Sequence, residues 1–243
     1  GQTVKRRPVD ETDKPKDADR PANPEREQRI LDAAARLIIH YGYDKTTVGE
    51  IAHEAGVSKG AVYLHWDSKD ALFKALLLRE MQTFTIRWLE LIEQDPNGGQ
   101  LQALYRHSLL AIQERPLLRA LVTQDKRVLG DFLRRQDAAL YAQRGGISRE
   151  FVRLMQQAGV VRTDIEPVMV AYVLNWIRAG MVFVDDLMPP DQVPPLDEAI
   201  NGLADFIERA FAPPGGGDSA AGKQAIRSMT AVLQAHWAQG RLM

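Results

Sequence analysis

One short stretch, residues 46–66, restricts the possible fold more than any other part of this sequence. Thr47 and Glu50 have the T-x-x-E spacing of a capping box, in which two side chains satisfy backbone N–H groups at a helix start. Gly56 suits the left-handed conformation that ends a helix, and Ser58 suits the N-cap of the next helix. The stretch therefore predicts two short helices, at about residues 47–55 and 58–64, joined by a glycine turn.

Neither helix is long enough to be stable alone, so the two have to pack against each other. The side chains suited to that packing are Val48, Ile51, Ala52, Val57, Val62 and Trp66. At 1.5 Å per residue the second helix is roughly 12 Å long, about the width of the DNA major groove. This spacing is typical of a helix-turn-helix whose second helix presents side chains to base edges.

The residues on either side complete a first module. Residues 1–22 are rich in charged residues and proline and almost lack aliphatic side chains, which predicts a flexible arm. Asn23, Pro24 and Glu25 form a helix start, and the apolar face that follows ends at Gly42. Ser68 is suited to cap a further, long helix. We therefore expect a three-helix domain over residues 23–68.

The rest of the chain also has a helical pattern. Breaks occur at residues 95–99, 115–116, 144–146 and 188–190, and no alternating strand pattern of useful length is present. The expected fold is all-α, with a helical domain over residues 69–211 and a linker over 212–222. An extra amphipathic helix over residues 223–243 carries the stripe Ile226, Met229, Leu233 and Trp237.

Residues 42–73, GYDKTTVGEIAHEAGVSKGAVYLHWDSKDALF, resemble the signature of the TetR family of transcriptional regulators. The resemblance covers residues 23–79 at most. Its matching positions are Thr47, Ile51, Ala52, Ala55, Gly56, Val57, Ser58, Gly60, Tyr63, Lys69 and Leu72. Two positions depart from the pattern, because Trp66 stands where phenylalanine is usual and Ala61 where a hydroxyl or larger side chain is common.

The resemblance and the side-chain chemistry together give candidate DNA contacts. Thr47 at a helix N-terminus and Lys69 in the first turn of the fourth helix suit phosphate oxygens. Tyr63 and His65 are similar to family positions whose rings lie along the DNA backbone. The candidates for the groove-facing surface are Ser58, Lys59, Gly60, Ala61 and Leu64. Among these, Gly60 allows close approach and Ala61 offers an apolar contact to a thymine methyl group.

Each candidate also has a purely structural interpretation. Thr47 and Ser58 are suited to capping whether or not they touch DNA, and Lys59 and Lys69 are also compatible with solvated surface charges. The basic residues at positions 5–7 (Lys5, Arg6 and Arg7) are compatible with a minor-groove arm, although a solvated tail is favoured.

The resemblance further implies a C-terminal domain that dimerises through its last two core helices and often contains a small-molecule pocket. By position those helices fall at about residues 164–184 and 196–211. Residues 168–184 are apolar on nearly every face, which indicates burial on two sides, one of them against a second subunit. The candidate pocket residues are Trp88, Tyr105, His107, Tyr141, Tyr172, Asn175, Trp176 and Arg178. Any one of them is more often a core or interface residue than a ligand contact.

Several classes of function have no support. The chain has no cysteine, no signal-peptide pattern and no apolar run long enough to span a membrane, so we expect a cytoplasmic protein. The net charge is −1, so any DNA contact has to be local. His53 and Glu54 begin an H-E-x-x-H motif, but Val57 replaces the second histidine, and no metal, cofactor or enzymatic activity is expected.

The sequence therefore predicts a homodimeric TetR-type repressor that binds a palindromic DNA operator and is released by a small-molecule effector. Three alternatives stay open: an activator or ligand-free architectural regulator with the same head, a helical small-molecule-binding protein without sequence-specific DNA binding, and an enzyme.

Overall fold

A computed structural model of the chain describes residues 23–132 and 148–238. The predicted arm (1–22), the candidate pocket residue Tyr141 and residues 239–243 lie outside the described residues. Over the described ranges every regular element is helical, which confirms the all-α prediction. The α-helices are α1 Pro24–Tyr41, α2 Val48–Glu54, α3 Lys59–Tyr63, α4 Lys69–Gln94, α5 Leu101–Gln113, α6 Pro116–Val122, α7 Lys126–Leu129, α10 Arg149–Gln157, α11 Pro167–Leu187, α12 Leu196–Phe211 and α13 Ser219–Trp237.

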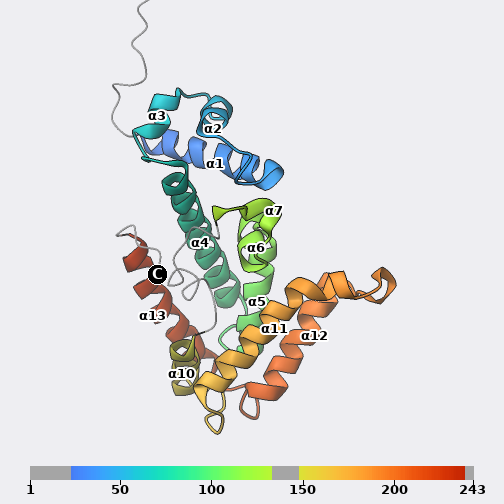
Figure 1. The fold of residues 1–243 in the computed structure, drawn as a ribbon. Helices are drawn as coiled ribbons and strands as arrows, with labels where there is room; N and C mark the ends of the chain where they lie inside the picture. Colours follow the sequence, from blue (N-terminus) through green and yellow to red (C-terminus); the bar gives the residue numbers. More distant parts are fainter. Residues whose placement is uncertain (1–22, 133–147, 239–243) are drawn as a thin grey trace, which may run out of the picture.

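The helices form an elongated molecule with a small head at one end (Figure 1). The head consists of α1, α2 and α3. The long helix α4 runs from the head along the body, and α5, α6 and α7 lie beside it. α11 and α12 project from the body on the side away from α13. The extra C-terminal helix α13 packs against α4 and α10.

The helix boundaries in the head are set by the predicted caps. Asn23 accepts a hydrogen bond from the Glu25 N–H at 2.9 Å, and Pro24 occupies the first helical position. Ser68 accepts a hydrogen bond from the Ala71 N–H at 3.0 Å and starts α4. Gly42 ends α1 with φ 90°, and Gly56 has φ 66° after α2. These predictions are confirmed.

α4 belongs to two hydrophobic cores at once. Its first turns contribute Leu72, Phe73, Leu76 and Leu77 to a core shared with α1, α2, α3, α6 and α7. Its last turns contribute Trp88 and Ile92 to a second core with α5, α10, α11, α12 and α13. α4 is therefore the structural link between the head and the body.

The loop after α1 docks onto the body as well. The Tyr43 N–H donates to the Val128 carbonyl of α7 at 2.8 Å, and the buried Tyr43 ring packs against Phe73 and Phe132. A Cβ on Gly42 would lie only 2.4 Å from the Arg127 carbonyl oxygen, so the backbones approach closely here. Head and body are thus in contact through α7 in addition to α4.

Two predicted boundaries in the C-terminal half differ from the structure. The helix expected at 164–184 is α11, which begins at Pro167 because proline is favoured in the first helical turn. The linker expected at 212–222 is shorter, because α13 begins at Ser219. Asp218 caps it by accepting hydrogen bonds from the Ala220 and Ala221 N–H groups. The predicted buried stripe of this helix is present, with Ile226 fully buried and Trp237 buried.

Candidate nucleic-acid interface

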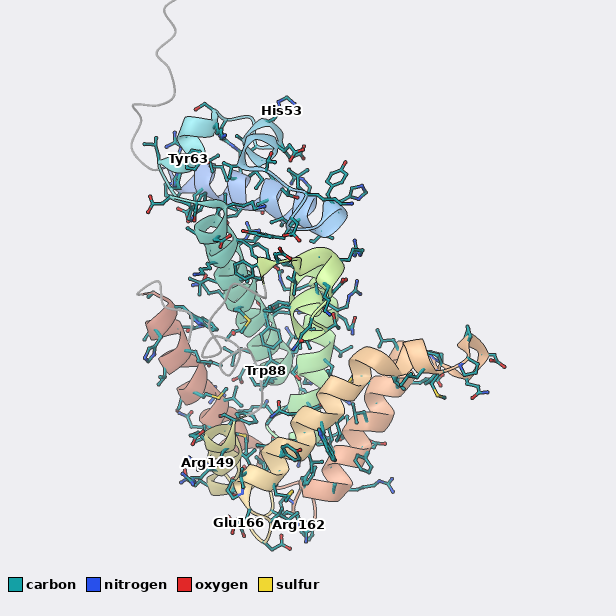
Figure 2. All side chains as sticks on the ribbon, in the orientation of Figure 1. His53, Tyr63, Trp88, Arg149, Arg162 and Glu166 are labelled. Carbon is teal, nitrogen blue, oxygen red and sulfur yellow. The ribbon has the colours of Figure 1, made fainter. Side chains whose placement is uncertain are left out.

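The outer surface of α3 lies at the far end of the head. Figure 2 shows Tyr63 and His53 at the end of the molecule that points away from the body. The exposed residues of this surface are Thr47, Ser58, Lys59, Gly60, Tyr63 and Leu64. Tyr63 and Leu64 are the large side chains of this surface, and they are 45% and 52% exposed. The structure thus leaves most of the predicted contact surface accessible.

The capping box fixes where α2 begins. The Thr47 hydroxyl accepts a hydrogen bond from the Glu50 N–H at 3.2 Å, and the Glu50 carboxylate accepts one from the Thr47 N–H at 2.8 Å. The backbone N–H and the hydroxyl of Thr47 lower the pKa of Glu50 from its ordinary value. Thr47 is therefore a structural cap in this state, and it remains exposed beside the helix N-terminus.

α3 is held by its own cap and by the core beneath it. The Ser58 hydroxyl accepts a hydrogen bond from the Ala61 N–H at 3.1 Å. Lys59 lies with its ammonium 6.0 Å from the centre of the Tyr63 ring, so these two side chains share one side of the helix. A Cβ on the exposed Gly60 would meet only the Ser58 hydroxyl, at 3.8 Å, so the surface above it is open.

Ala61 does not belong to the exposed surface. Its side chain is fully buried, and the neighbouring Val62 is 1% exposed. In a helix of five residues these two positions point toward the other helices of the head while Lys59, Gly60 and Tyr63 point outward. The predicted contact between Ala61 and a thymine methyl group is therefore wrong for this conformation.

His65 is also turned inward. Its side chain is only 4% exposed, Nε2 accepts a hydrogen bond from Arg26 Nε at 3.4 Å, and Nδ1 lies 3.8 Å from the Glu27 carboxylate. Arg26 itself is buried at 5% exposure. The prediction that the His65 ring lies along the DNA backbone is corrected, since the ring joins the end of α3 to α1. Its role in this structure is to position α3.

Lys69 binds backbone carbonyls of the head. Its ammonium donates to the Tyr43 carbonyl at 2.8 Å and to the Thr46 carbonyl at 3.0 Å, and it lies 4.1 Å from the centre of the Tyr43 ring. These bonds hold the loop that leads into α2. Lys45 in the same loop is exposed. It was not among the DNA contacts predicted from the sequence, because it occupies neither a cap nor a helical position. A phosphate contact by Lys69 stays a prediction.

The candidate pocket residues separate into two groups. Trp88, Tyr105 and His107 are buried around α4 and α5, and the Trp88 indole N–H donates to the Leu104 carbonyl at 3.0 Å. On α11, by contrast, Tyr172 and Trp176 are 57% and 67% exposed, and their rings are 5.2 Å apart. These two are corrected from pocket residues to residues of an exposed apolar face.

The remaining pocket candidates provide no evidence for a ligand site. The Asn175 amide donates to the Ala171 carbonyl at 2.8 Å, so its own helix supplies the polar partner that a ligand or subunit was expected to supply. Arg178 lies in α11, and its side chain is outside the described part of the structure, as is Tyr141. Hollows of about 690 and 260 Å³ occur among the described residues, and none of the described pocket candidates lines either of these two.

Clusters suited to a metal ion and helices suited to cross a membrane are both absent among the described residues. No cluster of three or more His, Cys, Asp or Glu side chains suited to a metal ion occurs among the described residues. None of the described helices combines the length and the apolar character that crossing a bilayer would require.

The short capped α2, the glycine turn and the exposed α3 together define a helix-turn-helix DNA-binding protein with a helical body.

Comparison with known proteins identifies relatives of this chain. Residues 30–76 match the family model for bacterial regulatory proteins of the tetR family. The regulator AcrR of Shigella flexneri is 36% identical over 105 residues, which are 43% of this chain and 46% of that protein. The repressor AcnR of Corynebacterium jeikeium is 26% identical over 191 residues, 79% of this chain and 94% of that protein. The head of this chain therefore matches the DNA-binding part of the tetR family of bacterial regulatory proteins.

Solved structures agree with this fold. SmeT, the repressor of the Stenotrophomonas maltophilia multidrug efflux pump SmeDEF, is 22% identical with a TM-score of 0.56, and the match covers 79% of this chain and 93% of SmeT. NalD of Pseudomonas aeruginosa is 22% identical with a TM-score of 0.52, over 79% of this chain and 98% of NalD. The chain spans only 46%, 27% and 24% of the length of the first curated relatives it matches, so their whole activities are not carried over.

Proposed function

We propose that this chain is a transcriptional repressor that binds a palindromic operator as a homodimer and is released by a small-molecule effector. The observation that carries the proposal is the exposed surface of α3, where Lys59, Tyr63 and Leu64 face outward over a buried support. Helices of this kind enter the major groove with their N-terminal residues at the base edges. Ser58, Lys59 and Gly60 hold that position here.

The proposed dimer interface is an exposed apolar face of α11. Val168, Tyr172 and Trp176 are spaced four residues apart and are 58%, 57% and 67% exposed. Met169 on α11 and Phe206 on α12 are exposed as well, at 53% and 56%. Exposed apolar side chains gathered in this way are costly in water and suit a two-fold interface with a second copy. The two heads of such a dimer are expected to bind half-sites about 34–36 Å apart.

The proposal also includes a small-molecule effector and a cytoplasmic location. The related structure of SmeT has been solved with triclosan, which supports a small-molecule effector for proteins of this fold. The chemistry and the relatives favour a cytoplasmic regulator over an enzyme, since AcrR and AcnR are both transcriptional regulators. The division into a head over residues 23–68, a regulatory domain and a separate C-terminal helix is part of the same proposal.

The test is selection of random duplex DNA on the purified full chain, with sequencing of the bound pool. We expect enrichment of a palindrome. Gly60→Asp adds a negative charge on the outer surface of α3 where a side chain has room, and it should abolish enrichment. Ser228→Asp adds the same charge on the exposed side of α13 and serves as the matched control. A folded, dimeric protein that enriches no sequence would favour the alternative, a helical small-molecule-binding protein.

The dimer has its own test by light scattering at micromolar concentration. Trp176→Arg should yield a monomer, because a charge would have to be buried in the interface. Val232→Arg changes an equally apolar side chain, 55% exposed on α13, and should leave the dimer intact. A monomeric wild-type protein would overturn this part of the proposal.

A further inference from the structure

One loop of the head is held from two sides. Residues 42–46 connect α1 to α2, and Thr46 directly precedes Thr47, the residue that caps α2. On the α4 side, the Lys69 ammonium donates to the Tyr43 carbonyl at 2.8 Å and to the Thr46 carbonyl at 3.0 Å. On the body side, the same loop is docked on α7 through the N–H group of Tyr43. The position of Thr47 therefore depends on both attachments.

The hydrogen-bonding capacity of Lys69 is directed into the head. An ammonium group has three N–H donors and no acceptor, and carbonyl oxygens of the loop take up two of these donors. The nitrogen also lies 4.1 Å from the centre of the Tyr43 ring, within the range of a cation–π contact. Lys69 is half-buried, whereas Lys45 and Lys59 are exposed. A DNA phosphate would have to displace these partners to bind the Lys69 ammonium directly.

The start of α2 depends on the same ammonium. Thr46 is 1% exposed, and a buried carbonyl that loses its hydrogen-bond donor is costly. The hydrogen bonds of Thr47 lower the pKa of Glu50, and the positive charge of Lys69 lowers it further, so Lys69 also faces the capping box. Removing the ammonium would therefore loosen the chain directly in front of the cap of α2.

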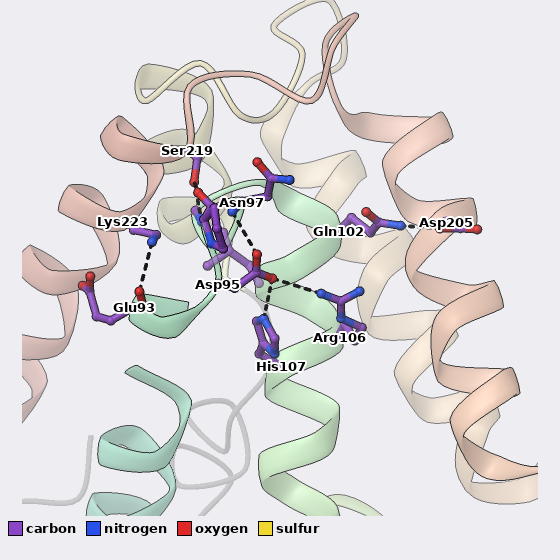
Figure 3. Close-up of polar contacts among 12 residues, drawn as sticks. Glu93, Asp95, Asn97, Gln102, Arg106, His107, Asp205, Ser219 and Lys223 are labelled. Atoms are coloured by element: carbon purple, nitrogen blue, oxygen red, sulfur yellow. Dashed lines mark hydrogen bonds and ion pairs between the residues drawn. The ribbon is translucent and has the colours of Figure 1, made fainter. Parts of the chain in front are cut away.

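Lys69 is the first residue of a helix that is anchored at its other end (Figure 3). Asp95 caps the C-terminus of α4 and accepts a hydrogen bond from Arg106 at 3.0 Å. It also lies 2.9 Å from Nε2 of His107, whose Nδ1 has no partner among the described residues. Burial acts to raise the pKa of Asp95, but the hydrogen bonds of His107 and of the Asn97 N–H and the nearby positive charge hold that pKa below its ordinary value. α4 thus holds Lys69 from the body.

We propose that Lys69 acts on DNA binding as a positioning residue, which holds residues 42–46 so that Thr47 and the start of α2 are presented to the DNA, without itself binding a phosphate. The residue pattern alone predicts a phosphate contact at this position, and the hydrogen bonds of the ammonium favour the different role. The assignment rests on the proposed regulator function through its DNA measurement.

The salt dependence of DNA binding separates the two roles. A side chain that neutralises a phosphate releases a counterion, so its removal reduces the slope of log affinity against log salt by about one. Lys69→Met removes the charge and both hydrogen bonds to the loop. We expect this variant to bind a duplex with the selected palindrome about tenfold more weakly at every salt concentration, with the slope of the wild-type protein. Lys59→Ala, at an exposed position, should reduce the slope.

A conservative variant adds a second criterion. Lys69→Gln keeps N–H donors for the loop carbonyls and has no charge, so a positioning role predicts that it binds the duplex more tightly than Lys69→Met. A phosphate contact predicts instead that both variants lose about one unit of slope. A slope reduced by about one in Lys69→Met would overturn the proposal. Should Lys69→Met fail to fold, the slope of Lys69→Gln decides.

Hydrogen exchange of the DNA-free protein tests the effect on α2 directly. The N–H groups of Glu50 and Ile51 donate to the Thr47 hydroxyl and carbonyl in the first turn of α2. Lys69→Met should raise the exchange rates of these two amides about tenfold, because the loop before the cap is released. Lys74→Met removes an exposed lysine from the same helix and should leave both rates unchanged. Unchanged rates in Lys69→Met would contradict the positioning role.

The outcome is separable from that of the DNA selection. If no palindrome is enriched, the proposed regulator function fails, and the exchange rates still decide whether Lys69 holds the loop. If a palindrome is enriched and the slope of Lys69→Met falls by about one, only the assignment of Lys69 fails.

Discussion

Arg79 of α4 forms an ion pair with Asp32 of α1, with Nη1 2.6 Å from the Asp32 carboxylate. The same guanidinium lies 3.6 Å from the buried carboxylate of Glu80, so Arg79 stands between the head and the body. Arg115, just before α6, completes the set at 2.7 Å from Glu80. Together with the docking of Tyr43 on α7, these ion pairs connect the head to the body.

A double-mutant cycle measures the coupling between Arg79 and Asp32. Asp32 is 56% exposed, so we expect an interaction free energy of only about 0.2–1 kcal/mol from the variants Arg79→Met and Asp32→Asn. Urea unfolding of the two single variants and the double variant gives the value. A coupling free energy indistinguishable from zero would show that the pair does not hold the head.

Replacing Glu80 is expected to lower the free energy of unfolding far more than replacing its neighbours. Its side chain is 6% exposed and is paired with Arg115, so Glu80→Ala leaves a positive charge beside an emptied, buried position. We expect a loss of about 3 kcal/mol in the free energy of unfolding by urea. Glu114→Ala removes an exposed carboxylate that pairs with Arg87 and should change stability little. Equal losses in the two variants would contradict the assigned role of burial.

Alanine variants of Gly42 and Gly56 form a matched pair that tests the docking of the head on α7. Both have positive φ, but a Cβ on Gly42 would collide with the Arg127 carbonyl, whereas a Cβ on Gly56 would meet nothing within 4 Å. Gly56→Ala should cost about 1 kcal/mol from its backbone conformation alone. Gly42→Ala should cost clearly more, because the carbonyl cannot move without breaking the Tyr43 contact. Thermal unfolding of both variants checks the order, and the reverse order would refute it.

The acid stability of the protein should depend on Asp95. Its native pKa is lowered, whereas the unfolded chain has the ordinary value of about 3.9. The stabilisation is therefore complete above about pH 4 and is lost as the pH falls through the lower, native pKa. Urea unfolding between pH 2.5 and 6 should show that Asp95→Asn is less stable than the wild type at pH 6 and that the difference shrinks in acid. The exposed Asp191→Asn variant is the control. A difference that grows toward low pH would contradict the sign.

Lys59 should contribute to both affinity and sequence preference. It is exposed at the start of α3, where side chains reach base edges and phosphates. Lys59→Ala is expected to weaken operator binding, relax base preference and reduce the salt slope by about one. Arg153→Ala on α10, at the far end of the molecule, removes an equal charge and should leave all three unchanged. An equal loss of operator affinity with both variants would show that Lys59 acts only through its charge.

The sequence by itself determined the local structure of the head. Asn23, Thr47, Ser58 and Ser68 act on backbone N–H groups only two or three residues away, so their spacing is visible in the linear order of the chain. Gly42 likewise ends α1 through its own backbone freedom. The helix-turn-helix could therefore be predicted before the structure.

The tertiary structure alone decided which face of each helix is covered. Ala61 and His65 are buried by α1 and the other head helices, and Tyr172 and Trp176 are left uncovered on α11, although the residue pattern assigned them otherwise. The ion pairs of Arg79 and the single used nitrogen of His107 depend on partners from other helices. Burial and pairing of this kind arise from residues far apart in the chain. Helical periodicity does not show which side chains of other helices will pack against a given face.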